Sequence, residues 1–137
     1  MDSVLHVEAW RKVWRQGIVP QLTKAGLRGL QKALERDSHR LITGATTCPP
    51  PLQFLAKLPV KACCPLCFAL LDGKQPYAVS VGSLEEQFAL ACYQGDQLAG
   101  EPGAIRYFLN WIDETPRQEM RSELLAEVKL ALARKTA

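Results

Sequence analysis

The sequence has little of what most enzyme active sites require. It contains two histidines, and neither a glycine-rich phosphate loop nor an HExxH zinc motif occurs in it. Its longest uncharged apolar stretch, Ala62 to Leu71, has ten residues, whereas a bilayer span needs about 20. Charged residues at positions 2 and 8 interrupt the early apolar residues, unlike in a signal peptide. We therefore expect a cytoplasmic protein with no membrane span and no enzymatic activity.

The composition predicts a single domain. The chain has 137 residues, of which 47% are hydrophobic and 23% charged, and this balance excludes intrinsic disorder. We expect a mainly α-helical fold, a small bundle of five or six helices with at most one short strand. Its parts are a basic N-terminal helical hairpin (1–40), an irregular Cys/Pro-rich middle segment (41–82) and a three-helix C-terminal segment (83–137).

The N-terminal part predicts two helices. The first is expected from Ser3 to about Gln16, with Gly17 ending it. The second is expected from Thr23, a capping residue, to Asp37, with leucines repeating at helical spacing. The short connection between them indicates that the two helices pair as a hairpin.

One face of the first predicted helix is aromatic. Val7, Trp10 and Trp14 recur at helical spacing, and Arg11 and Arg15 lie beside them. We favour packing of both tryptophans onto the second helix. The alternative is that Trp10 and Trp14 contact a protein partner or stack on nucleic-acid bases, so both are candidate interaction residues.

The net charge of +3 is unevenly distributed. Residues 1–40 hold eight Lys and Arg against four Asp and Glu, whereas the remainder holds nine against ten. The basic excess is therefore wholly N-terminal. It permits a nucleic-acid-binding regulator as an alternative function, although a dedicated nucleic-acid-binding domain usually has a denser basic patch.

The middle segment combines prolines, cysteines and one apolar run. Three consecutive prolines, Pro49 to Pro51, predict an extended stretch. Pro65 favours a helix start, and the run from Leu66 to Leu71 predicts a short buried helix. Alternation from Tyr77 to Val81 predicts one short strand.

The cysteines allow a zinc site. The chain has five of them: Cys48, Cys63, Cys64, Cys67 and Cys92. The CxxC spacing of Cys64 and Cys67 supplies two zinc ligands from one turn, and Cys48 and Cys92 complete a candidate structural zinc site. Cys63, His6 and His39 are possible substitutes for individual ligands.

The same pair also allows dithiol chemistry. The motif Cys64-Pro65-Leu66-Cys67 is similar to the Cys-Pro-x-Cys dithiol of glutaredoxins over these four residues. This resemblance implies a redox function, and a helix N-terminus at Cys64 would stabilise the reactive thiolate. The third interpretation is that the cysteines are reduced residues of the core, which is their commonest role in a cytoplasmic protein.

The C-terminal segment predicts three helices. Ser83 and Glu86 form a capping box for the first, which ends at Gly100. The second spans about 104–113, and the third begins at Thr115 and Pro116. The apolar face of the third consists of Met120, Leu124, Val128, Ala131 and Leu132.

The helix at 104–113 has an unusually wide apolar arc of roughly 200°, from Ala104 round to Tyr107 and Trp111. Either its neighbours enclose it, or part of it meets another chain. Tyr107 and Trp111 are therefore candidate interaction residues of a homodimer or a partner complex.

The last helix carries an acidic row, formed by Glu119, Glu123 and Glu127. Basic residues of the N-terminal part can pair with this row inside the chain or across an interface, namely Arg11, Arg15 and Lys32.

We therefore predict a small helical binding or adaptor module that acts through protein–protein contacts, either with or without a structural zinc ion. A dithiol redox protein and a nucleic-acid-binding regulator are the alternatives. The sequence does not identify the partner.

Overall fold

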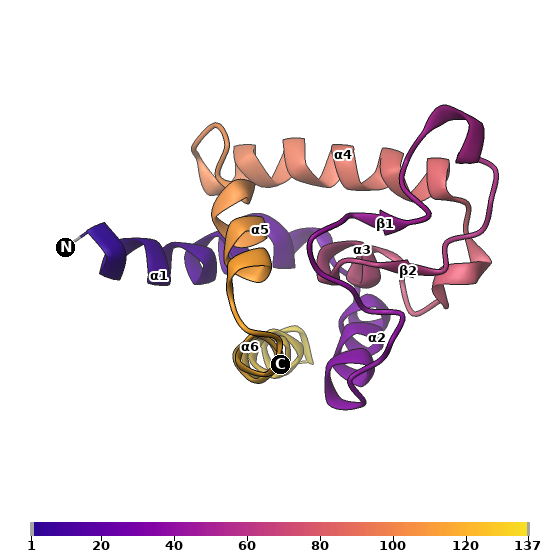
Figure 1. Ribbon diagram of the computed structural model, residues 1–137. Coiled ribbons are helices and arrows are strands. Elements are labelled where there is room, and N and C mark those ends of the chain that lie inside the picture. The colour runs from indigo at the N-terminus through magenta and orange to yellow at the C-terminus, as the bar shows by residue number, and fades with distance from the viewer. Residues whose placement is uncertain (1, 137) are drawn as a thin grey trace.

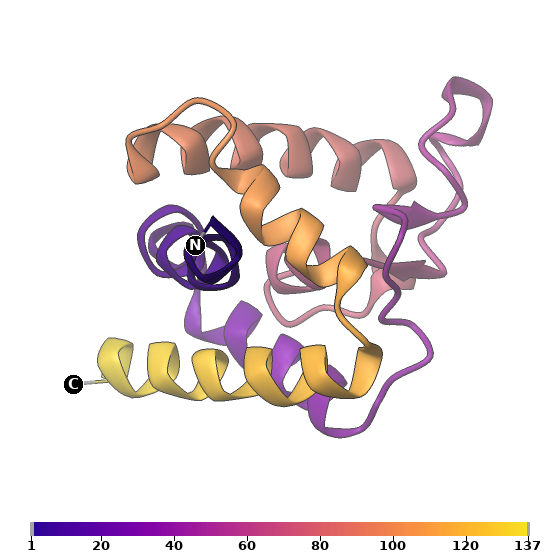
Figure 2. The ribbon, with the colours of Figure 1, turned by 60° about the vertical axis from the view of Figure 1, so that its left-hand side comes forward.

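The computed structural model describes the backbone of residues 2–136 and the side chains of residues 8–135. Over this range the chain is mainly helical, and its α-helices are α1 (Asp2–Val13), α2 (Lys24–Glu35), α3 (Pro65–Leu70), α4 (Val81–Ala99), α5 (Ile105–Glu114) and α6 (Arg117–Thr136). Helices α4 and α6 lie on opposite sides of the molecule, with α1, α3 and α5 between them (Figure 1, Figure 2). The predicted mainly α-helical class is confirmed.

The first helix continues beyond its predicted end. After α1 the chain forms a π-helical turn, η1 (Trp14–Ile18), and a 3-10 turn, η2 (Val19–Gln21). Gly17 therefore does not end the helix. It lets the backbone of η1 approach α4, because a Cβ at Gly17 would lie 2.7 Å from the carbonyl oxygen of Gly95. The side chains of Ser3, His6 and Val7 lie outside the described residues.

The predicted N-terminal hairpin is wrong. Helix α1 lies against α5, and η1 lies against α4, whereas α2 lies against α6 and α3. Each N-terminal helix thus buries its apolar face on a segment from later in the chain. The predicted start of α2 is confirmed, since the Thr23 hydroxyl accepts a hydrogen bond from the Gly26 N–H at 3.0 Å.

The middle segment contains a small sheet instead of the predicted strand at Tyr77–Val81. Strands β1 (Thr47–Cys48) and β2 (Ala62–Cys63) pair antiparallel. Residues 76–78 form the 3-10 turn η4 (Pro76–Ala78), and Val81 already begins α4. Residues 79–81 do meet residues 58–60, because the Val60 N–H donates to the Val79 carbonyl oxygen at 3.1 Å and the Val81 N–H donates to the Leu58 carbonyl oxygen at 2.9 Å. This single bridge, between Pro59 and Ser80, is too short to form a strand. The short buried helix predicted at Leu66–Leu71 is confirmed as α3.

Helix α4 starts three residues before the predicted capping box. Ser80 is the capping residue, and its hydroxyl accepts a hydrogen bond from the Ser83 N–H at 3.2 Å. Gly100 ends α4 with φ +78°, as predicted.

One hydrophobic core joins the elements. The predicted inner face of α6 is confirmed, because Met120, Leu124, Val128 and Ala131 are buried and Leu132 packs against them. Helix α5 crosses from α4 to α6 through the middle of the molecule (Figure 2). Its residues Ile105, Phe108 and Ile112 are buried. The wide apolar arc of α5 is therefore enclosed largely by its own chain.

Candidate functional site

The N-terminal tryptophans are core residues. Trp10 and Trp14 are fully buried. Trp10 stacks on Trp111 with ring centroids 3.6 Å apart, and Trp14 stacks on Phe108 at 5.5 Å. Both side chains are covered by the chain itself, so the structure does not support their predicted role as interaction residues. Trp111 and Tyr107 are partly buried and pack against the same core.

Two glutamates of the acidic row of α6, Glu123 and Glu127, are paired within the chain. The Arg15 guanidinium donates to Glu127 from Nε at 2.8 Å and from Nη2 at 2.7 Å. This hydrogen bond, together with the charge of Glu127, raises the pKa of Arg15. Arg11 contacts Glu123 at 3.3 Å. The sequence allowed these ion pairs to form inside the chain or across an interface, and in the structure they form inside the chain.

Cys64 and Cys67 form a hydrogen-bonded thiol pair at the start of α3. Cys64 is the capping residue, and Pro65 occupies the first helical position. A hydrogen bond from the Cys67 thiol lowers the pKa of Cys64 against the opposing effect of burial, and the backbone N–H groups of Cys67 and Leu66 lower it further. The same hydrogen bond and burial raise the pKa of Cys67. Cys64 is therefore the thiol of this pair that ionises first.

The pair is shielded from solvent. Cys64 is 7% exposed and Cys67 is fully buried. The pKa of Cys92 in α4 is raised to about 12. Burial is the largest cause, and the charges of Cys64, Asp96 and Glu85 raise it further. Burial raises the pKa of Cys63 as well. All five cysteines are free thiols.

The predicted zinc ligands do not converge. Cys48 is exposed on β1, whereas Cys64 and Cys67 are buried at α3. Within the part of the chain that the structure describes, no three His, Cys, Asp or Glu side chains are grouped so that they would hold a metal ion. The zinc site of Cys48, Cys64, Cys67 and Cys92 stays a prediction that this geometry does not support.

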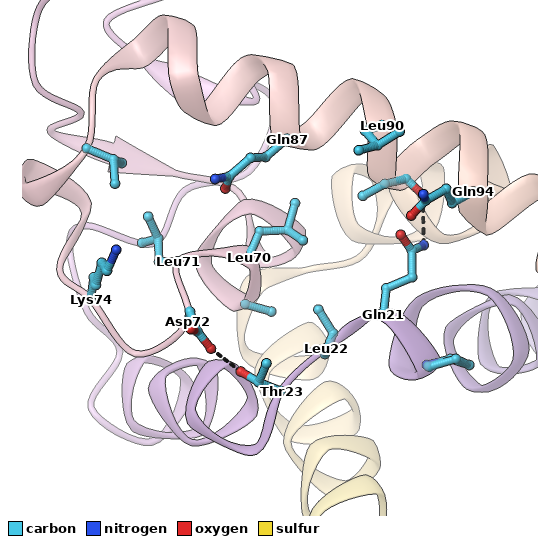
Figure 3. Close-up of a pocket in the computed structure, with 14 residues that line it drawn as sticks. Gln21, Leu22, Thr23, Leu70, Leu71, Asp72, Lys74, Gln87, Leu90 and Gln94 are labelled. Atoms are coloured by element: carbon cyan, nitrogen blue, oxygen red, sulfur yellow. Dashed lines mark hydrogen bonds between the residues drawn. The ribbon is translucent and has the colours of Figure 1, made fainter.

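A groove of about 580 Å³ lies between α4, the end of α3 and the η2–α2 connection. Figure 3 shows Gln87, Leu90 and Gln94 on the α4 side, with Leu70 and Leu22 across from them. The amide nitrogen of Gln21 spans part of the gap, because it donates to the carbonyl oxygens of Gly17 at 2.8 Å and Ala91 at 2.9 Å. At the other end the Thr23 hydroxyl donates to Asp72. The groove is thus lined by apolar side chains and amides between α3 and α4, and by Asp72 and Lys74 at the end near Thr23.

The outward surface of α4 continues this groove. Leu90, Tyr93 and Leu98 are 56%, 63% and 51% exposed. No charged residue occurs between Glu86 and Asp96. This surface was not identified from the sequence. The signal that could have revealed it is the uncharged stretch between Glu86 and Asp96, which carries apolar residues on more than one side of the helix.

No protein family, curated protein or solved structure matches this chain. None of the described helices combines the length and the apolar character that a bilayer crossing requires. A functional proposal therefore rests on the surfaces and thiols described above.

Proposed function

We propose that the protein is a non-enzymatic binding module that docks a segment of another protein on α4. The observation that carries this proposal is the exposure of Leu90 and Tyr93 on the uncharged stretch of α4 between Glu86 and Asp96, with exposed Leu98 just beyond Asp96. Burying such apolar area against a partner is favourable, and large apolar side chains grouped on one exposed surface mark interaction sites. We therefore propose that the partner contacts this surface of α4 and not Trp10 and Trp14, which the sequence had suggested.

The groove beside α4 indicates the chemistry of the docked segment. Leu70 and Leu90 offer an apolar wall, which suits leucine-like or aromatic side chains. The side-chain amides of Gln87 and Gln94 form no hydrogen bond with another described residue, and each amide donates and accepts. They suit the backbone of a bound segment, so we expect an uncharged peptide stretch with apolar anchors.

A matched pair of variants tests this function. Leu90→Glu places a charge in the proposed contact surface, whereas Leu130→Glu makes the same change on α6, where Leu130 is 37% exposed. Quantitative affinity purification from the native host should identify a protein that binds wild type and Leu130→Glu and is lost with Leu90→Glu. Equal binding by both variants would contradict the proposal.

The thiol pair favours a second candidate function, a dithiol that is oxidised to a disulfide. The observation in its favour is the placement of Cys64 and Cys67 within one turn at the start of α3, where interaction with the Cys67 thiol lowers the pKa of Cys64. In this reaction the Cys64 thiolate attacks a low-molecular-weight disulfide and releases one thiolate. Cys67 then displaces the second, so that the pair is oxidised and the small disulfide is reduced to two thiols. Incubation with oxidised glutathione followed by peptide mass analysis should show a Cys64–Cys67 disulfide, and unreacted thiols would reject this candidate.

A further inference from the structure

Helix α2 and its C-terminal capping residue carry a row of unpaired cations. Lys24, Arg28, Lys32 and Arg36 follow one another at four-residue intervals and are all exposed. Each interval advances about 6 Å along a helix axis. None of the four side chains forms an ion pair or a hydrogen bond with another described side chain. The row is therefore available to an external anion.

Three of these cations line a second groove, of about 380 Å³. Arg28 and Lys32 come from α2, Arg36 directly follows α2, and Lys74 comes from the turn that follows α3. The floor between them is made of small residues, among them Ala25, Gly29 and Gly73. Four positive charges thus surround a surface that a ligand backbone can approach closely.

The acidic residues nearby are directed elsewhere. Neither Asp nor Glu lines the groove. Asp37, just beyond α2, is held by Arg117 at 2.7 Å, and this hydrogen bond lowers its pKa. Asp72 accepts the hydrogen bond of Thr23 and lines the other groove. Glu35 is exposed on α2 and does not line the groove.

The two basic N-terminal helices therefore differ in role. Arg11 of α1 and Arg15 of η1 are neutralised by Glu123 and Glu127 of α6. On α2 the cations stay unpaired and converge with Lys74 on one groove. The N-terminal charge excess is thus displayed to solvent mainly at this groove.

We propose that this groove binds the phosphate backbone of a nucleic-acid duplex. A row of cations at a regular repeat complements a polymer whose negative charges also repeat regularly, and arginine donates in a geometry that matches phosphate oxygens. The one aromatic residue lining the groove, Phe68, is buried at 6% exposure. The groove therefore lacks a surface on which unpaired bases would stack, which favours a duplex over a single strand and sequence-independent contact over base recognition.

The number of cations sets the expected salt dependence. Four phosphate contacts correspond to a slope of about −3.6 in a plot of log affinity against log salt concentration for duplex DNA. Affinity should then fall about 100-fold between 50 and 200 mM salt. Removing two of the four contacts should reduce this loss to about 10-fold.

A matched pair of double variants tests the proposal in the full chain. Arg28→Gln with Lys32→Gln removes two groove cations, whereas Arg106→Gln with Lys129→Gln removes one exposed arginine and one exposed lysine elsewhere. Binding is measured by fluorescence anisotropy with labelled duplexes of about 20 base pairs, which exceed the length of the α2 row at about 3.4 Å per base pair. Single strands of the same length and polyglutamate serve as competitors. Circular dichroism confirms that the variants remain folded.

We expect the wild-type protein to bind the duplex with the steep salt dependence given above. The groove variant should bind with lower affinity and a shallower salt dependence. The control variant should match wild type in both. Three outcomes would overturn the proposal. They are no duplex binding at 50 mM salt, equal losses in the two double variants, and displacement by single strands or polyglutamate as effective as displacement by unlabelled duplex. The last outcome would assign the groove to single strands or to acidic proteins instead.

Discussion

Glu127 of α6 accepts both of its hydrogen bonds from the guanidinium of Arg15, which lies 112 positions earlier in the chain. The Glu127 side chain is 7% exposed, whereas that of Arg15 is 43% exposed. Replacing Glu127 by Gln keeps the size of the side chain and leaves a nearly buried amide against a cation. We expect the free energy of unfolding to fall by about 2 kcal/mol in urea denaturation.

Glu123→Gln is the matched control for that variant. Glu123 occupies the same row of α6, contacts Arg11 at 3.3 Å and is 35% exposed. Solvent screens this pair, so its loss should cost less than about 1 kcal/mol. Equal losses for the two variants would show that the burial of Glu127 has no influence on the strength of its ion pair.

Two glycines of α2 should respond to alanine in opposite directions. A Cβ at Gly26 would lie 2.3 Å from the carbonyl oxygen of Ala69 in α3. This oxygen belongs to the backbone, so it cannot move aside by a change of side-chain rotamer. Gly26→Ala should therefore destabilise the protein by about 2 kcal/mol. At Gly29 the nearest atom would lie at 3.4 Å, so Gly29→Ala should stabilise it by up to about 1 kcal/mol through helix propensity. Thermal unfolding of both variants measures the contrast, and a Gly26→Ala protein as stable as wild type would contradict the close packing of α2 on α3.

The thiol pair predicts an early ionisation. Because hydrogen bonding lowers the pKa of Cys64, its thiolate should appear at a lower pH than that of an ordinary cysteine. Ultraviolet absorbance of the thiolate during a pH titration should show this step in wild type and lose it in Cys64→Ser. Cys92→Ser is the control, because the pKa of Cys92 is raised to about 12 and its loss should leave the early step in place. An early step that persists in Cys64→Ser would belong to another thiol.

Trp111 distinguishes internal packing from self-association. Its ring stacks on Trp10 with planes 6° apart, so Trp111→Ala should lower the free energy of unfolding by about 2 kcal/mol. Tyr93→Ala, at a site 63% exposed, should change it by less than about 0.5 kcal/mol. Light scattering over a wide concentration range accompanies both measurements. A stable Trp111→Ala protein that converts from dimer to monomer would restore the interface that the sequence predicted at this residue.

Helix starts and ends were predictable where the signal is carried by adjacent residues. Thr23 caps α2, Pro65 opens α3 and Gly100 ends α4, because capping and turn formation depend on groups within one helical turn. Gly17 shows where this reasoning fails. Its lack of a side chain serves the approach of α4, a partner far away in sequence, and no local pattern distinguishes that role from a helix end.

The candidate site was predicted less well than the fold. The CxxC spacing identified the hydrogen-bonded pair of Cys64 and Cys67, since these residues share one helical turn. Zinc binding would also require Cys48 and Cys92, and spacing alone does not determine whether distant residues converge. The aromatic face of α1 was correctly recognised as apolar, but its burial against α5 depended on the fold.

The sequence by itself determined the helical class, most helix boundaries, the inner face of α6 and the N-terminal location of the excess charge, because these properties follow from neighbouring residues and from periodicity. Tertiary structure decided which surfaces remained exposed. It paired Arg15 of η1 with Glu127 of α6 while leaving Arg28 of α2 unpaired, and it buried Trp10 while exposing Leu90. Burial and pairing depend on which distant segments share the core, and that arrangement minimises the free energy of the whole chain and not of any single helix.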